Sequence, residues 1–268
     1  MGSIKGKLAP QGELLPLGWA DVKAACPLVF HITNIPASPL QANVCLAVGA
    51  EPVMSRHPGE ASDIAAQADA FLLNLGTPTR SSIEAAKAAA DVAEALGTFT
   101  VFDPVGCGLT KLRRRAVEYF LERHRFSVIK GNADEICTLA GVSKGRAAAR
   151  GANSEIKAKH VERAVTLLAE QCHCVVYATG QTDVMSVNGG GVKRIEGGSA
   201  LLPLVSGSGC AVGTLIAAAG AALQDAEQAA LLGGTLMKRA SERAEQAEKK
   251  THVPFAAALV AEIGRAAV

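Results

Sequence analysis

One stretch decides the fold: FLLNLGTPTRSSIEAAKAAADVAEALGTFTVFD (residues 71–103). Its two ends, FLLNL and FTVFD, are short and almost wholly apolar, which is typical of strands buried on both faces of a parallel sheet. The segment between them predicts a helix that begins with a capping box of Ser81 and Glu84 and ends at Gly97. The apolar face of this helix comprises Ile83, Ala86, Ala90, Ala93 and Leu96. The stretch therefore predicts a right-handed strand–helix–strand unit.

The same alternation continues along the chain in both directions. Further strands are predicted at 126–130 and 174–178, helices at 112–124, 133–140 and 156–170, a hairpin at 183–187 and 192–196, and C-terminal helices at 211–223, 226–248 and 254–267. This order predicts an α/β fold, a three-layer α/β/α sandwich with a mostly parallel central sheet. We expect a single domain over 1–268, in which 1–17 is a loose tail and the basic segment 143–155 a mobile loop.

Composition excludes several classes of protein. With 49% apolar and 19% charged residues the chain is globular, and a net charge of +2 disfavours nucleic acid or an anionic membrane as partner. The uncharged run 211–223 is too short to span a bilayer, and the N-terminus has no signal peptide pattern. Seven cysteines without a disulfide spacing indicate a reduced, cytoplasmic protein.

Polar and glycine residues follow each predicted strand at its carboxyl end, where open parallel sheets bind ligands. They are Gly76-Thr77, Asp103, Gly131–Glu135, Thr179-Gly180 and the later segment Gly207–Cys210. Because these ends meet at one edge of the sheet, we expect one site there.

The segment GSGC (207–210) opens an apolar helix. Its small residues let a phosphate approach the free amides of the helix N-terminus, whose dipole favours an anion. The same field lowers the pKa of a thiol, so Cys210 is a candidate thiolate that accepts a proton from an alcohol. The alternative interpretation is a small buried cysteine at a tight turn. The segment matches neither a Walker motif nor a dinucleotide fingerprint.

Asp103 and Glu135 are candidate magnesium ligands, since Mg²⁺ prefers carboxylate oxygens beside phosphate. Glu135 has an alternative interpretation as a residue that caps a helix. Lys130 is a candidate for neutralising phosphate charge, or for pairing with a neighbouring acid.

Six segments together resemble the hydroxyethylthiazole kinase family of the ribokinase-like superfamily. They are HITNIPASPLQANVCLAVGAEPVM (31–54), LLNLGT (72–77), DPVGCG (103–108), IKGNADEI (129–136), ATG (178–180) and GSGCAVG (207–213). The resemblance implies ATP-dependent phosphorylation of the hydroxyl of 4-methyl-5-(2-hydroxyethyl)thiazole in thiamine salvage, with Mg²⁺, by a homotrimer whose sites lie between subunits.

The resemblance also implies roles for individual residues. The substrate-binding residues are Met54, Gly207, Asn34 and Gly76; the ATP-binding residues are Lys130, Thr179 and Gly209; the magnesium-associated acids are Asp103 and Glu135; and the catalytic residue is Cys210. The chain departs from the family pattern at Ser208, where threonine is usual, and at Ile32 and Gly198-Ser199.

Three other functions stay open at this point. The chain could phosphorylate a pyrimidine or pyridoxal-type alcohol or dehydrate a nucleotide hydrate, although the segment 31–54 argues against both. Cys210 could instead be the nucleophile of an acyl transferase, with His31 or His57 as its partner. Finally, the chain could bind nucleotide without turnover.

Overall fold

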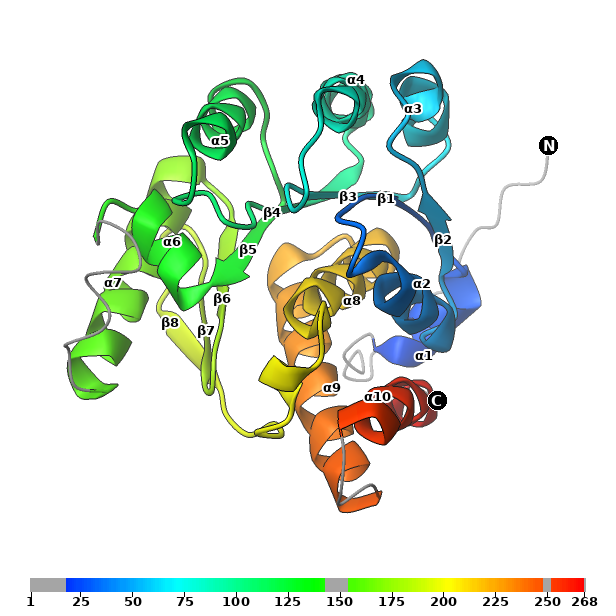
Figure 1. Ribbon diagram of the computed structural model, residues 1–268, viewed down its shortest axis with the longest axis vertical. Helices are drawn as coiled ribbons and strands as arrows, with labels where there is room; N and C mark the ends of the chain where they lie inside the picture. The colour runs from blue at the N-terminus through cyan, green and yellow to red at the C-terminus, as the bar shows by residue number, and fades with distance from the viewer. Residues whose placement is uncertain (1–17, 143–153, 248–251, 268) are drawn as a thin grey trace, which may run out of the picture.

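The computed structural model describes residues 18–142, 154–247 and 252–267, and within them an eight-stranded sheet lies between two layers of helices (Figure 1). The strands are β1 (Leu28–Ile32), β2 (Glu51–Met54), β3 (Ala70–Asn74), β4 (Phe99–Asp103), β5 (Val128–Asn132), β6 (Val175–Thr179), β7 (Asp183–Ser186) and β8 (Val192–Ile195). Their order is β2-β1-β3-β4-β5-β6-β7-β8, in which the pairs from β2 to β6 are parallel and the last two antiparallel. The predicted α/β sandwich is confirmed.

The helices divide between the two faces of the sheet (Figure 1). One layer contains α3 (Pro58–Ala65), α4 (Arg80–Leu96), α5 (Lys111–Arg123), α6 (Ala133–Leu139) and α7 (Ser154–Cys172). The other contains α1 (Trp19–Ala25), α2 (Ser38–Ala47), α8 (Ser208–Leu223), α9 (Ala226–Ala247) and α10 (His252–Ala266). A short 3-10 helix, Leu202–Leu204, precedes α8. Each layer has its own apolar cluster against the sheet.

Helix α8 runs across the middle of the sheet and is almost wholly buried. Its glycines set how closely it packs. A Cβ at Gly220 would lie 2.1 Å from the ring of Phe99, and one at Gly213 would lie 3.1 Å from Leu72. Because α8 packs this closely against the sheet, its first turn lies at the carboxyl edge of β3, β4 and β5.

Two strands and three helices were not predicted: β1, β2, α1, α2 and α3. β1 contains His31, which is fully buried although it is polar, and β2 is a half-exposed edge strand that contains Pro52. β1, LVFHI, has one polar residue in an apolar run, as FLLNL has, and the sequence analysis overlooked it; β2 shows neither an apolar run nor strict alternation.

Helix α4 corrects two details. Thr79, and not Ser81, is its N-cap, and its capping box pairs Thr79 with Ser82 instead of Ser81 with Glu84. Leu96 was predicted on the buried face but is 60% exposed. Leu96 is the last residue of the helix. The periodicity therefore identified the apolar face of the helix but not the residue at which this face stops being buried.

The predicted tail 1–17 and the loop residues 143–153 lie outside the described residues, while Ser154 already begins α7. No described helix combines the length and apolarity needed to cross a membrane. All seven cysteines are free thiols.

Candidate active site

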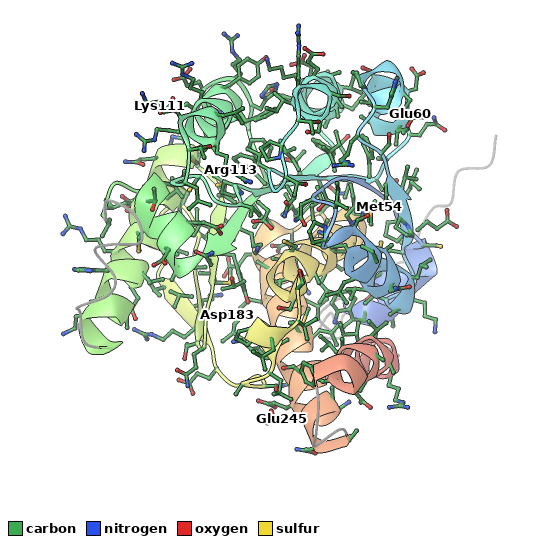
Figure 2. The ribbon with its side chains drawn as sticks, viewed as in Figure 1. Met54, Glu60, Lys111, Arg113, Asp183 and Glu245 are labelled. Carbon is green, nitrogen blue, oxygen red and sulfur yellow. The ribbon has the colours of Figure 1, made fainter. Side chains whose placement is uncertain are left out.

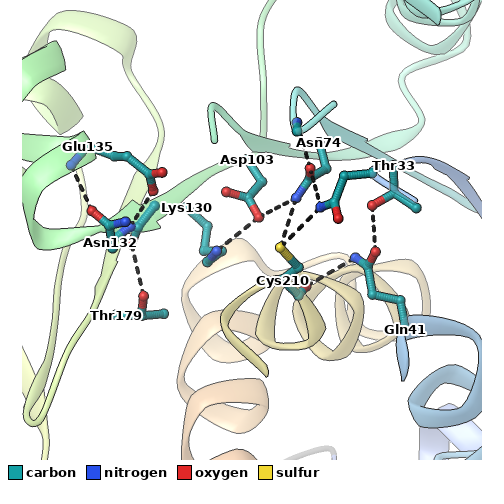
Figure 3. A network of polar contacts seen from close by, with 12 residues as sticks. Thr33, Gln41, Asn74, Asp103, Lys130, Asn132, Glu135, Thr179 and Cys210 are labelled. Carbon is teal, nitrogen blue, oxygen red and sulfur yellow. Dashed lines mark hydrogen bonds and ion pairs between the residues drawn. The ribbon is translucent and has the colours of Figure 1, made fainter. Parts of the chain in front are cut away.

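Five residues from separate elements meet at the carboxyl edge of the sheet, and we call them the Asn74 network: Asn34, Asn74, Asp103, Lys130 and Cys210 (Figure 3). Asn74 and Asp103 are the last residues of β3 and β4 and are paired in register, so their side chains emerge side by side. Cys210 comes from the first turn of α8. The sequence predicted that four of these residues share a site, and the structure brings all four together.

Asn74 is the centre of the network. Its Nδ2 donates to Asp103 Oδ2 over 2.7 Å and to Cys210 Sγ over 3.2 Å. Its Oδ1 accepts the backbone N–H of Gly76 at 2.9 Å, which fixes the orientation of the amide. Asn74 therefore presents donors to both the carboxylate and the sulfur.

Asn34 supplies a second donor to the sulfur. Its Nδ2 lies 3.0 Å from Asn74 Oδ1 and 3.5 Å from Cys210 Sγ, while its Oδ1 accepts the N–H of Ala37. A Cβ at Gly76 would come within 2.6 Å of Asn34 Cβ, so only glycine allows this approach. The predicted substrate residues Asn34 and Gly76 are thus in direct contact.

Lys130 and Asp103 form a buried ion pair with Nζ 3.0 Å from Oδ2. Burial alone would lower the pKa of Lys130, but the nearby acids, chiefly Asp103, outweigh it and the pKa lies above its ordinary value. Asp103 Oδ1 is buried and has no hydrogen-bond partner among the described residues. The predicted pairing of Lys130 with an acid is confirmed, and one carboxylate oxygen stays available.

Cys210 lies one turn into α8, which begins at Ser208 and not at Ala211 as predicted. Gly207 is the N-cap with φ +86°, and a Cβ there would lie 2.8 Å from Ala37. The expectation that the helix N-terminus lowers the pKa of Cys210 is wrong. Burial and then the charge of Asp103 raise this pKa to about 11, and the opposing effects of Lys130, Asn74 and Asn34 are smaller. Cys210 is therefore a thiol at neutral pH.

Glu135 belongs to a capping box at the start of α6. Its backbone N–H donates to Asn132 Oδ1 and its Oε2 accepts the N–H of Asn132 (Figure 3). Its Oε1 accepts the N–H of Gly106 at 2.7 Å. The capping interpretation is confirmed. Burial and then the charge of Asp103 raise the pKa of Glu135. In the described part of the chain, no group of three or more His, Cys, Asp or Glu side chains is placed to hold a metal ion.

Two cavities lie near the Asn74 network: one includes Thr33 and Ile35, the chain neighbours of Asn34, and the other includes Gly209, the chain neighbour of Cys210. The Met54 cavity has a volume of about 360 Å³ and lies at the edge strand β2, where Figure 2 labels Met54; its lining is His31, Thr33, Ile35, Ser38, Pro39, Met54, Ser55 and Arg56. The Thr179 cavity has a volume of about 440 Å³ and includes Thr179, Gly180, Ser208, Gly209 and Lys238. A Cβ at Gly209 would meet nothing within 4 Å, so the helix backbone there is open to a ligand. Of the predicted binding residues, Met54 lines the first cavity and Thr179 and Gly209 line the second, whereas the linings of both cavities lack Asn34, Gly76, Gly207 and Lys130.

Gln41 links the Met54 cavity to Cys210. Thr33 Oγ1 donates to Gln41 Oε1, and Gln41 Nε2 donates to the carbonyl oxygen of Cys210 over 3.2 Å (Figure 3). Sequence analysis missed both Gln41 and Asn74. Asn74 had one signal, since it is the polar residue of the apolar run FLLNL, whereas Gln41 lies in a helix that was not predicted.

Neither candidate histidine contacts Cys210. His31 Nδ1 donates to Val29 O and its Nε2 accepts from Thr214 Oγ1, and burial lowers its pKa to about 4. His57 Nδ1 accepts the N–H of Gly59 and caps α3. Within the described residues, therefore, neither of these two histidines pairs with Cys210 as the base of a cysteine nucleophile would.

Known proteins of similar sequence and fold were compared with the chain. The model of the hydroxyethylthiazole kinase family matches residues 19–266. A hydroxyethylthiazole kinase of Actinobacillus succinogenes is 42% identical over 200 residues, which cover 74% of this chain and 72% of that protein. The solved structure of a hydroxyethylthiazole kinase from Pyrococcus horikoshii OT3 is 30% identical with a TM-score of 0.82, covering 92% of this chain and 91% of the other. A ribokinase-like superfamily protein from Enterococcus faecalis V583, 10% identical with a TM-score of 0.64 over 95% of this chain and 91% of its own, is similar in fold alone.

Proposed function

The chain belongs to the hydroxyethylthiazole kinase family, and from this membership we propose that it transfers the terminal phosphoryl group of ATP to the hydroxyl of 4-methyl-5-(2-hydroxyethyl)thiazole in thiamine salvage. It is a kinase with a ribokinase-like fold. The observation that carries the proposal is the Asn74 network, which places a buried lysine, a carboxylate and a thiol at the start of α8, near two cavities.

We assign the Thr179 cavity to ATP and the Met54 cavity to the thiazole. The open backbone at Gly209 admits phosphate to the first-turn amides of α8, which have no carbonyl partners within the helix. Lys130 neutralises charge on the transferred group. Phosphoryl transfer passes through a loose transition state, so alignment and charge neutralisation supply most of the catalysis.

A magnesium ion fits the residues present. Asp103 Oδ1 is a buried carboxylate oxygen with no partner within the described residues, and Mg²⁺ prefers such hard ligands. Asp103 would hold the ion, with Glu135, in the first turn of α6 after the neighbouring strand β5, as a residue near it. When bound, magnesium neutralises phosphate charge and offsets the charge of Asp103.

Cys210 takes the hydroxyl proton in its thiolate form. Its sulfur accepts N–H donors from Asn34 and Asn74, and both favour the thiolate. Because its pKa is about 11, the thiolate is a minor species at neutral pH but a strong base. We expect kcat/KM to rise about tenfold per pH unit between pH 7 and 9, as general base catalysis by a group of higher pKa requires.

The test is to incubate the protein with ATP, magnesium and the thiazole alcohol and to detect the phosphate ester by mass. Replacing the base in Cys210→Ala should lower kcat by about 10²–10⁴. Cys174→Ala, at a buried cysteine just before β6, is the matched control and should retain turnover. Absence of ester from the wild-type protein would overturn the function, and wild-type turnover by Cys210→Ala would overturn the role of the thiol.

The active form is proposed to be a homotrimer. Ile35 lines the Met54 cavity and is 61% exposed, and β2 is an edge strand with one side unpaired within the described residues. Single exposed apolar side chains are common on protein surfaces, so the proposal rests on the family resemblance, which implies sites between subunits. Light scattering measures the mass directly, and a monomer that is fully active would contradict the proposal.

A further inference from the structure

A buried ion pair forms part of the lining of the Thr179 cavity, away from the Asn74 network. Lys238 of α9 and Asp183 of β7 approach to 3.0 Å between Nζ and Oδ1, and their side chains are 6% and 4% exposed. Figure 2 labels Asp183, where β7 begins. Replacing such a pair by apolar residues is often neutral or stabilising, so overall stability is a weak reason for its presence.

Lys238 and Asp183 form hydrogen bonds to the turn that follows β6. The Lys238 ammonium donates to the carbonyl oxygens of Gly180 and Gln181, each over 2.8 Å, and forms its ion pair with Asp183 at the same time. Asp183 Oδ1 accepts the N–H of Gly180 at 2.8 Å, and its Oδ2 accepts the hydroxyl of Tyr177 at 2.6 Å. Both backbone polar groups of Gly180 are thus fixed by one ion pair.

The loop residues Gly198 and Ser199 pack against α9 beside the alkyl chain of Lys238. A Cβ at Gly198 would lie 2.6 Å from Lys238 Cδ, so only glycine fits there. The N–H of Gly198 donates to Glu242 and that of Ser199 to Ser241 Oγ, which fastens this loop to α9 as well. With water excluded, the hydrogen bonds to the turn are stronger than they would be at the surface.

The turn held by this ion pair, Gly180 and Gln181, forms one wall of the Thr179 cavity. Thr179, Gly180 and Gln181 line it on one side, and Ser208 and Gly209 of α8 line it on the other. The distance between these two walls decides whether a ligand that touches both can bind. The ion pair controls one wall only, since the other is set by the packing of α8 on the sheet.

We propose that Lys238 and Asp183 are positioning residues for the nucleotide, because they hold the Gly180 turn at the separation from the start of α8 that ATP needs. This inference rests on the proposed function, which places ATP in the Thr179 cavity. Neither residue takes part in phosphoryl transfer, and neither touches the Met54 cavity. Their loss should therefore affect the nucleotide and spare the alcohol.

The experiment compares Lys238→Met with the double variant Asp183→Asn/Lys238→Met. The single variant leaves a buried carboxylate unpaired and should be destabilised, whereas the double variant removes both charges and should regain part of the lost Tm. Both lose the bonds to the carbonyl oxygens of Gly180 and Gln181. We expect both to bind the non-hydrolysable analogue AMP-PNP, with magnesium, on the order of tenfold more weakly by calorimetry, since misplacing a binding group by about 1 Å can cost up to about a hundredfold.

In turnover assays, both variants should raise KM for ATP and leave KM for the alcohol and kcat near wild type. Phe120→Leu is the control for lost stability, because Phe120 is fully buried in the other layer; it should lower Tm without changing the affinity for AMP-PNP. If the double variant binds AMP-PNP like the wild type, the positioning role is wrong and the proposed function stands. If the wild-type protein itself does not bind AMP-PNP, both the positioning role and the proposed function are wrong.

Discussion

The reactivity of Cys210 gives the sharpest test of the site. At pH 8, a pKa of about 11 leaves about one thiol in a thousand ionised, and the thiolate is the form that iodoacetamide alkylates. Alkylation of Cys210 should therefore be slow and should accelerate about tenfold per pH unit. Mass spectrometry of peptides resolves it from the other cysteines, and the exposed Cys26 reports the reactivity of the reagent in the same sample.

Asn74→Leu should slow this alkylation. The substitution removes an N–H donor that lies 3.2 Å from the sulfur and favours the thiolate. A hydrogen bond to a charged group contributes about 1.5–3 kcal/mol. At about 1.4 kcal/mol per pKa unit, the lower figure predicts a rate about tenfold smaller. Gln41→Leu removes a buried amide that contacts the backbone oxygen of the same cysteine and should leave the rate unchanged.

Asp103→Asn should have the opposite effect. Its carboxylate charge raises the pKa of Cys210, so neutralising it should lower the pKa and speed alkylation at pH 8. Two neighbouring substitutions that change one rate in opposite directions cannot both result from loosened packing. Faster alkylation in Asn74→Leu, or slower alkylation in Asp103→Asn, would refute this account of the network.

Three further predictions concern stability and the helix glycines. The folded-state pKa of His31 is lowered to about 4, so the neutral imidazole contributes fully to the free energy of unfolding above pH 6.5, and this contribution is lost as the pH falls towards 4. Urea unfolding should show a decrease of about 3 kcal/mol in the free energy of unfolding over this range, and the decrease should be smaller in His31→Gln. An equal dependence of the free energy on pH in that variant would contradict the prediction. Gly220→Ala should destabilise the fold by about 1–3 kcal/mol in chemical unfolding, because its Cβ would overlap the ring of Phe99; a wild-type midpoint would show that α8 can move away. Gly209→Ala should keep the wild-type Tm but weaken ATP binding, whereas Gly207→Ala should lower Tm, since only Gly207 has positive φ and a crowded Cβ position; the reverse pattern would remove Gly209 from the phosphate site.

The sheet was largely predictable because its central strands are buried on both faces. β3 and β4 are wholly buried and consist of five residues each, so composition alone indicates them. β1 was overlooked although its apolar run matches that of β3 in composition, and His31 within it satisfies both ring nitrogens inside the protein. β2 was missed for a physical reason, since an edge strand needs little apolar surface. Local composition does not encode a hydrogen bond that a residue makes with a helix 183 positions away.

The sequence predicted which residues lie together in the site, but it did not predict their protonation states. Parallel strands bring their carboxyl ends to one edge, which placed Asp103, Lys130 and Thr179 near Cys210. The pKa of Cys210 was predicted with the wrong sign, because the helix dipole is visible in a sequence while burial and the approach of Asp103 are not. Asn74 and the Lys238–Asp183 pair depend on contacts across 136 and 55 positions and on side chains with no motif of their own.

The parallel order of the strands has a practical use. The Asn74 network lies at the carboxyl edge, so the turns that lead into β4, β5 and β6 from the opposite edge lie away from it. Arg125 is exposed in the turn before β5 and, unlike Gly97 and His173 in the other two turns, does not have a positive φ that a substitution would strain. A fluorophore, spin label or surface tether attached there would leave both cavities facing the solvent, so the kinase can be immobilised or tracked while it works.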